Sequence, residues 1–140
     1  MLRTTTDQEA RALLSKSSVG RLGCVSAGEP YVVPINYYFD GRAIYSHSLP
    51  GRKIDALRAH PRACMQVDKI DDQLHWQSAI AFGQFEEIFD EPERAEVIRQ
   101  LLNRFPMLTV VESKVADQGT SPDPLVFRIK VDRVTGVSEV

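Results

Sequence analysis

The residues best suited to chemistry in this sequence lie close together between Tyr45 and Lys53, where the chain reads Tyr-Ser-His-Ser-Leu-Pro-Gly-Arg-Lys. This segment leaves a predicted strand, turns at Pro50-Gly51 and enters a predicted helix whose first turn carries two cations. Cations at that end are unfavourable to the helix dipole, because the free N–H groups already make it positive. An anion bound to those N–H groups would reverse the sign of the interaction.

Four side chains of the segment could bind a phosphate together with the helix N-terminus. They are the hydroxyls of Ser46 and Ser48 and the cations of Arg52 and Lys53, and hydrogen bonds between such cations and phosphate are strong. The alternative is that the two cations are solvated turn residues, since a turn with two cations is a weak motif. His47, between the two serines, is either an ordinary hydrogen-bonded residue or a catalytic one.

Signatures of other site chemistries are missing from the sequence. The two cysteines, Cys24 and Cys64, are too few for a disulfide framework and too far apart for a zinc site, so we interpret them as buried thiols on strands, with a reactive thiol as the alternative. The three histidines form no ligand pair, and we predict no metal site. GxGxxG, GxxxxGK[ST] and GxSxG are also absent, which removes the main support for Rossmann, P-loop and α/β-hydrolase folds.

Composition limits the class of protein. The 140 residues predict one domain, 1–140, and the 43% apolar and 26% charged residues are typical of globular chains. Seventeen Lys and Arg against nineteen Asp and Glu give a net charge of -2, which offers no basic surface for nucleic acid. No apolar run approaches the roughly 20 residues of a membrane helix, and residues 1–10 lack the apolar region of a signal peptide. We therefore expect a cytoplasmic protein that binds neither nucleic acid nor membrane.

The elements that must position residues 45–53 are short strands joined by tight turns. The predicted strands are Val19–Ser26, Tyr31–Phe39, Arg42–Ser48, Ala63–Val67, Trp76–Phe89 and Leu125–Val134. The predicted helices begin at Thr6, near Arg52 and at Pro92, the last with an apolar stripe of Val97, Ile98, Leu101 and Leu102. About six antiparallel strands with two or three short helices predict a mainly β protein built as a small barrel.

Several residues predict local features of that barrel. Asp40-Gly41 favours a type I′ hairpin turn, in which both central residues have positive φ. Pro34 inside a strand predicts a sheet edge, a bulge, or a place where something other than a strand approaches. Gly83 predicts a bend or bulge midway along a long strand. Residues 105–124 are predicted to be irregular, with 117–122 the most mobile part.

Residues 45–53 resemble the strand-turn-Arg-Lys segment of the pyridoxamine 5′-phosphate oxidase-like flavoproteins. They are closest to the short Nim-type branch, the nitroimidazole-resistance-related proteins. Three further stretches, Val19–Gly23, Val33–Tyr37 and Ser78–Gly83, occur in the family's order, so that the resemblance covers roughly residues 10–105. No single stretch is specific, and the ordered set carries the resemblance.

The resemblance implies a six-stranded split β-barrel that forms a homodimer and binds FMN at the subunit interface. Arg52 and Lys53 would hold the FMN phosphate, and His47 would lie beside the flavin in a catalytic role. A stretch near Trp76 would approach the flavin, in the same chain or from the partner. The implied flavin-binding residues are Pro34, Ile35, Asn36, Ser46, His47, Ser48, Gly51, Arg52, Lys53, Trp76, Gln77 and Ser78.

The function implied is that of an FMN-dependent oxidoreductase acting on a small organic substrate. The alternatives are a non-catalytic flavin carrier or sensor, a related split barrel that binds haem or a deazaflavin, and an interaction module with an empty barrel. In the pyridoxamine phosphate oxidases themselves a longer C-terminal region with Trp and Arg completes the substrate site. The chain ends at Val140 without such a region, so we do not expect vitamin B6 oxidation. Tyr37, Tyr38 and Trp76 are the expected dimer-surface aromatics, although Tyr37 and Tyr38 alternate and only one of them can face inward.

Overall fold

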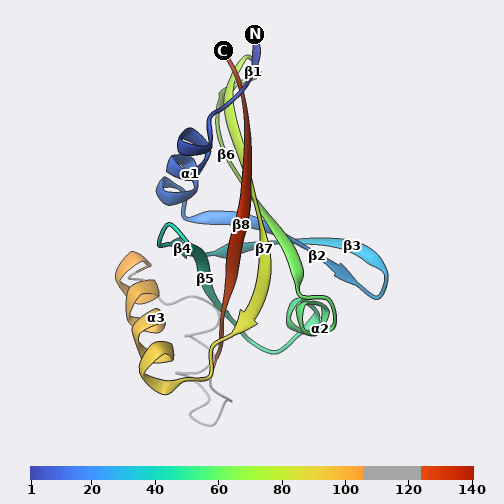
Figure 1. Cartoon of the computed structure of the whole chain (residues 1–140), viewed down its shortest axis with the longest axis vertical. Helices are drawn as coiled ribbons and strands as arrows, with labels where there is room; N and C mark the ends of the chain where they lie inside the picture. Colours follow the sequence, from blue (N-terminus) through green and yellow to red (C-terminus); the bar gives the residue numbers. More distant parts are fainter. Residues whose placement is uncertain (106–123) are drawn as a thin grey trace.

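A computed structural model describes residues 1–105 and 124–140 as one antiparallel sheet with three helices (Figure 1). The strands are β1 (Leu2–Thr4), β2 (Val19–Ser26), β3 (Glu29–Asn36), β4 (Tyr38–Phe39), β5 (Ala43–Ser48), β6 (Arg62–Asp72), β7 (His75–Glu87) and β8 (Leu125–Glu139). The helices are α1 (Asp7–Lys16), α2 (Arg52–Ala59) and α3 (Glu91–Arg104). The mainly β fold is confirmed, but this part of the chain forms eight strands instead of six, because one predicted strand is broken in two and β1 was not predicted.

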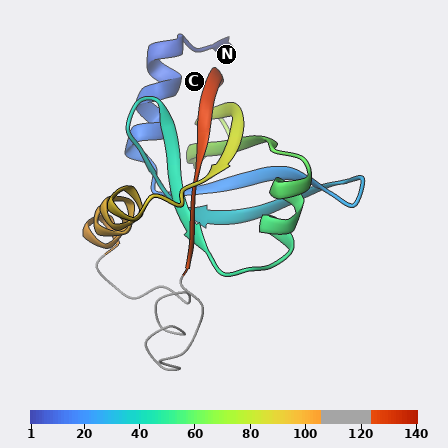
Figure 2. The ribbon, with the colours of Figure 1, turned by 60° about the horizontal axis from the view of Figure 1, so that its bottom comes forward.

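The strand order makes the sheet a partly open barrel. Hydrogen-bonded neighbours follow the order β3-β2-β6-β7-β8-β5-β4, and β1 pairs with the end of β8. The two edge strands of this order, β3 and β4, are consecutive in the chain and are separated by a single residue. The sheet must therefore curl until its two edges lie close together, which leaves the barrel split between them (Figure 2).

Tyr37 is the residue that joins the two edges and breaks the predicted Tyr31–Phe39 strand. Its ring is fully buried, its N–H donates to the carbonyl of Ser18 at 3.1 Å, and its hydroxyl donates to the carbonyl of Leu14. The prediction that only one of the two neighbouring tyrosines faces inward is confirmed. Tyr37 is a core residue, so its expected place on an exposed dimer surface was wrong.

The turn after β4 differs from the prediction, and a turn with two positive φ values occurs elsewhere in the sheet. In the turn after β4 only Gly41 has a positive φ, of 95°, while the carboxylate of Asp40 accepts the N–H groups of Arg42 and Ala43, both at 2.8 Å. The type I′ prediction at Asp40-Gly41 was therefore wrong. The Asp40 carboxylate holds this turn by accepting its N–H groups, and only Gly41 needs a positive φ. Positive φ at both central residues occurs instead between β2 and β3, at Ala27 with 51° and Gly28 with 80°. A non-glycine residue in this conformation costs about 1 kcal/mol.

The predicted irregularities at Pro34 and Gly83 are confirmed. Pro34 lies in β3, at the edge of the sheet, where its missing N–H leaves no neighbouring strand unpaired. The pairing of β7 with β8 shifts register between Phe82 and Gly83. A Cβ at Gly83 would come within 2.2 Å of the Lys130 carbonyl oxygen, so only glycine fits this bulge.

Two strands run further than their sequences predicted. β6 continues five residues beyond Val67 to Asp72, and β8 continues five residues beyond Val134 to Glu139. The β6 extension is mostly exposed, whereas the β8 extension alternates between buried and less buried residues. Each contains a single large apolar residue, so no apolar pattern in the sequence marked them. They pair through the backbone with β7 and, in the case of β8, also with β1.

The helices begin where their capping residues indicate. Thr6 Oγ1 accepts the N–H of Glu9 at 3.1 Å before α1, and the Asp90 carboxylate accepts the N–H of Glu93 at 3.2 Å before α3. α2 packs Ile54 and Leu57 into the barrel core, whereas α3 covers the outer side of β4 and β5 (Figure 1). The predicted apolar stripe of α3 holds for the buried residues Val97 and Leu101 and the half-buried Ile98, but Leu102 is 39% exposed.

Two further predictions concern the extent of the described chain and membrane-spanning helices. The predictions for residues 106–123, including the mobile 117–122, lie outside the part of the chain that the structure describes. Within residues 1–105 and 124–140, no helix combines the length and the apolar character needed to cross a lipid bilayer.

Candidate functional site

The first turn of α2 has the features of an anion site. Gly51 precedes the helix, and no side chain accepts a hydrogen bond from the first-turn N–H groups. A Cβ built at Gly51 would meet no atom within 4 Å, so there is free space beside this end of the helix. Arg52 and Lys53 follow directly, and the helix packs against β2 at the barrel end formed by the β2–β3 hairpin (Figure 2). The uncapped N–H groups and the two cations suit a phosphate or another anion.

Arg52 is held by two residues of the β2–β3 hairpin. Its Nε donates to Ser26 Oγ at 2.8 Å, and its guanidinium carbon lies 4.4 Å from the ring centroid of Tyr31. No carboxylate pairs with Arg52 in the described part of the chain, whereas most arginines there do have one. The arginines paired with a carboxylate are Arg3, Arg11, Arg21, Arg58, Arg62, Arg94, Arg99 and Arg128. A guanidinium has five N–H donors, so those on the two terminal nitrogens remain for a ligand.

Ser26 and Tyr31 were not identified in the sequence. They lie 26 and 21 positions before Arg52 in a separate hairpin, and no motif joins them to it. The only signal was the alternation of β2, which places the hydroxyl of Ser26 among inward-facing side chains at the strand end. That pattern shows a buried polar group but does not name its partner.

Lys53 is half-buried and has no carboxylate partner among the described residues. Burial lowers the pKa of its ammonium group, and the nearby thiol of Cys24 partly opposes that decrease. Burial also raises the pKa of the Cys24 thiol, with a further increase from Cys64, while Lys53 and Arg52 act to lower it. The interpretation as buried free thiols is confirmed for Cys24, whereas Cys64 is half-buried. A bound anion would offset the free-energy cost of burying the Lys53 charge.

Ser46 and Ser48 donate their hydroxyl hydrogens within the protein. Ser46 Oγ donates to the carbonyl of Asn36 at 2.6 Å, and Ser48 Oγ donates to the carbonyl of Leu49 at 2.8 Å. Both side chains are buried. The Ser46 bond links β5 to β3 across the barrel opening, so this serine has a structural contact that the sequence did not predict.

His47 faces the opposite side of β5 from the two serines. Side chains alternate along a strand, so Ser46 points to the barrel interior with Ile44, whereas His47 points outward with Tyr45. His47 is 9% exposed and pairs with Val126, which packs against Val97 and Leu101 of α3. The segment 45–53 thus divides between the interior, the α3 side and the start of α2.

The three predicted residues of β3 also divide between the two faces of the sheet. Pro34 is exposed and Asn36 is half-buried, and both lie on the outer face. Ile35 is 5% exposed, and its side chain belongs to the barrel core. Only the backbone of Ile35 could therefore contact a ligand on the outer face.

Trp76, Gln77 and Ser78 do not join this site within one chain. They lie at the start of β7, in the β6–β7 hairpin near the chain termini, and all three are half-buried (Figure 1). Cys64 of β6 pairs with Gly23 beside the α2 site, and Ile70, six residues further on, pairs with Trp76. Six residues of extended strand span roughly 20 Å.

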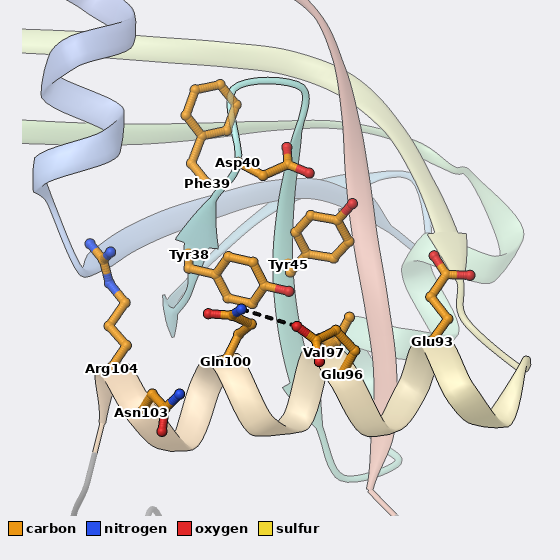
Figure 3. Close-up of a pocket in the computed structure, with 10 residues that line it drawn as sticks. All are labelled: Tyr38, Phe39, Asp40, Tyr45, Glu93, Glu96, Val97, Gln100, Asn103 and Arg104. Atoms are coloured by element: carbon orange, nitrogen blue, oxygen red, sulfur yellow. Dashed lines mark hydrogen bonds between the residues drawn. The ribbon is translucent and has the colours of Figure 1, made fainter.

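Two cavities among the described residues are lined by none of the predicted site residues. One of about 670 Å³ lies between α3 and the β4–β5 hairpin (Figure 3). Another of about 340 Å³ is a shallow apolar groove on the outer face of β3, β2, β6 and β7, lined in part by Val25, Val32, Cys64 and Phe82. No group of three or more metal-ligating side chains occurs in the described residues.

Comparisons with known proteins give relatives along the whole chain. A family model described as pyridoxamine 5′-phosphate oxidase matches residues 6–138. An uncharacterised protein of Rhizobium meliloti is 30% identical over 144 residues, which cover 96% of this chain and 93% of its own length.

Two solved structures share the fold. An FAD-binding protein from Mesorhizobium loti is 31% identical with a TM-score of 0.82, and the match covers 100% of this chain and 98% of that one. A proposed 5-nitroimidazole antibiotic resistance protein from Bacteroides thetaiotaomicron is 21% identical with a TM-score of 0.75, covering 99% of this chain and 89% of that one. The second likeness, at this identity, shows the fold alone.

The buried charge of Lys53 generates a testable pH dependence. Its pKa is lower in the folded state than in the unfolded state, so the unfolded state binds more protons and the free energy of unfolding rises with pH up to the ordinary lysine range. Lys53→Met removes the charge and keeps an apolar stem. We expect the ligand-free variant to be at least as stable as the parent near pH 7. Towards about pH 10 the free energy of unfolding of the parent should rise relative to that of the variant. Urea unfolding in phosphate-free buffer measures both profiles, and parallel profiles would contradict this account.

Proposed function

Because the chain belongs to the pyridoxamine 5′-phosphate oxidase family, we propose that it is a flavoprotein whose flavin phosphate binds at the start of α2. The observation that carries the proposal is the pair of Arg52 and Lys53. Neither has a carboxylate partner in the described chain, and they lie beside uncapped N–H groups and the free space at Gly51. The FAD-binding relative at 31% identity supports a flavin over haem or a deazaflavin.

The proposed ligand is FMN, with FAD as the other outcome. The two flavins share the ribityl phosphate, which is the only part that Arg52 and Lys53 need to bind. The relative from Mesorhizobium loti binds FAD, which keeps the larger flavin open for this chain. Placement in the Nim-type branch is also a proposal, supported by residues 45–53 and by the fold of the nitroimidazole-resistance relative.

The active form in this proposal is a homodimer with the flavin between subunits. Trp76, Gln77 and Ser78 lie too far along β6 and β7 to join Arg52 in one chain, so a second copy would have to supply them. The apolar groove on the outer face of the sheet gives that copy a surface to cover: Val32 is 63% exposed there and Val25 is 40% exposed. A two-fold dimer buries the same patch of both chains.

The reaction class proposed is oxidation–reduction of a small organic substrate, and a bound flavin would supply the electron transfer. The chain would hold the phosphate through Arg52 and Lys53 and place Pro34 and Asn36 of the outer β3 face against the flavin ring. His47 would hold or deliver a proton from a ring nitrogen. The two free thiols agree with a reducing compartment such as the cytoplasm, which is part of the same proposal.

Phosphate binding is tested by comparing flavins. Two charge-assisted hydrogen bonds are worth about 1.5–3 kcal/mol each, so the apo-protein should bind FMN and FAD at least roughly a hundredfold more tightly than riboflavin. In the double variant Arg52→Ala, Lys53→Ala this gap should fall to about tenfold or less. Titration by flavin fluorescence quenching measures all three affinities.

A matched control comes from the same helix. Arg58→Ala removes a cation that pairs with Glu87 at the other end of α2, and it should leave the gap between FMN and riboflavin unchanged. Equal affinity of the unmutated protein for FMN and riboflavin would remove the phosphate role from α2 and, with it, the main support for a flavoprotein.

The homodimer generates a second prediction. Val32→Glu puts a charge on an exposed residue of the apolar groove, so it should leave the fold intact and shift the protein to monomers at micromolar concentration. Flavin retention should fall with it, because dimerisation and interfacial binding are linked by mass action. Analytical ultracentrifugation followed at a flavin wavelength measures both. Leu102→Glu is the control, because it adds the same charge to an exposed residue of α3 outside the groove and should leave the dimer intact. A monomer that retains its flavin would contradict an interfacial site.

Catalysis is tested at His47. If its imidazole transfers a proton to the substrate, His47→Ala should lower turnover by roughly a hundredfold or more at full flavin occupancy. The assay follows oxidation of a reduced nicotinamide with a small nitroaromatic acceptor. His60→Ala, which changes the exposed residue after α2, should be silent. Unchanged turnover in His47→Ala would mean that His47 has a structural role and no catalytic one. If the parent protein shows no turnover, the non-catalytic flavin carrier is favoured.

A further inference from the structure

A cavity of about 670 Å³ is separate from the α2 site, and its lining contains three carboxylates and one cation. It lies between α3 and the β4–β5 hairpin, on the outer side of the barrel (Figure 3). Its volume is within the range of small-molecule sites, about 300–1,000 Å³. None of the flavin-binding residues implied by the family resemblance lines it.

One wall of the cavity is a pair of stacked aromatic rings. The centroids of Tyr38 and Tyr45 are 4.9 Å apart with an interplanar angle of 16°, and the two rings lie side by side on the β4–β5 hairpin (Figure 3). Both residues are half-buried and rest on a small cluster with Val97 and Leu101. The stack presents a rigid π surface, which attracts planar rings and cations.

The rest of the lining is mainly acidic. Asp40, Glu93 and Glu96 bring carboxylates to the cavity, against the single cation Arg104, whose guanidinium donates to the carbonyls of Ser15 and Ser17. Hydrogen bonds from Arg99 and Gln100 lower the pKa of Glu96 to about 2, so its carboxylate is ionised at neutral pH.

The partners of two carboxylates do not line the cavity. Glu93 pairs with Arg128 and Glu96 pairs with Arg99, and both arginines lie outside the lining residues. The negative charge also acts on the tyrosines: burial raises the pKa of Tyr38, and Tyr45, Asp40, Glu96 and Glu93 raise it further. Arg99 and Arg128 offset two of these carboxylates, and Arg128 also acts to lower the pKa of Tyr45. The carboxylates that line the cavity and the tyrosine rings still favour a cation over an anion at the wall itself.

We propose that this cavity binds a small aromatic amine or ammonium ion, with its ring against the Tyr38–Tyr45 stack and its positive group beside Glu96. The proposal goes beyond flavin binding and does not depend on it, since no residue of the α2 site takes part. Tyr45 and His47 are two positions apart on the same face of β5, about 7 Å along the strand. A ligand on the stack would thus lie near His47.

The test uses two probes of the same size and different charge. The full-length protein, as purified, is titrated with 2-phenylethylammonium and with the uncharged 2-phenylethanol by isothermal calorimetry. We expect the ammonium to bind at least about tenfold more tightly than the alcohol, since a cation–π contact and a carboxylate both act on the charge. Equal affinities, or no binding of the ammonium at millimolar concentration, would overturn the proposal.

The variants separate the carboxylate from its ion pair. Glu96 is half-exposed, so Glu96→Gln should fold normally and lower the affinity for the ammonium about fivefold, while the alcohol is unaffected. Arg99→Gln breaks the same ion pair but leaves the carboxylate in the cavity, so the affinity should stay the same or increase. An equal loss in both variants would mean that the ion pair holds α3 and that the cavity does not recognise charge. Because Glu96 and Arg99 lie on α3 and outside the α2 site, a change in ammonium affinity in these variants reports on this cavity and not on flavin phosphate binding.

Discussion

The path of the chain at Tyr37 is the constraint on which the rest of the structure depends. One residue carries the backbone from β3, at one edge of the sheet, to β4, at the other, so the sheet has to curl. The fully buried ring and the hydrogen bonds to Ser18 and Leu14 fix that crossing beneath α1. The bond from Ser46 to the Asn36 carbonyl adds a second link across the opening. These contacts hold β5 across the opening from β3, and with it the candidate site residues Ser46, His47 and Ser48.

Alternation along β5 then separates two chemical environments. Ile44 and Ser46 point into the barrel, whereas Tyr45 and His47 point towards α3. The chain leaves β5 and starts α2 with two cations that no carboxylate of the described residues neutralises. On the α3 side the carboxylates outnumber the cations around the tyrosine stack. The cations at α2 and the carboxylates on the α3 side are thus kept apart by the alternation of a single strand.

The sequence predicted most of the elements, because their signals are local. Capping by Thr6, the start of α2 at Arg52, the edge position of Pro34 and the bulge at Gly83 all follow from what a few neighbouring residues permit. The break at Tyr37 was missed, since nothing near a tyrosine in a β-branched run shows that its N–H will bind Ser18 across the fold.

The site was harder to predict than the fold, because its contacts join distant segments. The cations at the start of α2 could be recognised from their order in the chain. Their neighbours Ser26, Tyr31 and Cys24 could not, since those positions depend on how the β2–β3 hairpin packs on α2. Neither could the acidic cavity, whose walls come from two separate stretches, the β4–β5 hairpin and α3. Only the assembled sheet brings such residues together.

The place of β8 in the sheet has a consequence for biosynthesis. This strand lies between β7 and β5 and also pairs with β1, yet it follows every other described strand in the sequence and so leaves the ribosome after them. Until it emerges, the described strands form two unconnected parts, β3-β2-β6-β7 and β5-β4, and β1 has no partner strand. Each part has unpaired edges. Pairings between residues so far apart in sequence form slowly, and open edges invite aggregation. Until β8 joins them, those edges can pair with other chains, so the last strand both closes the sheet and removes its aggregation-prone edges.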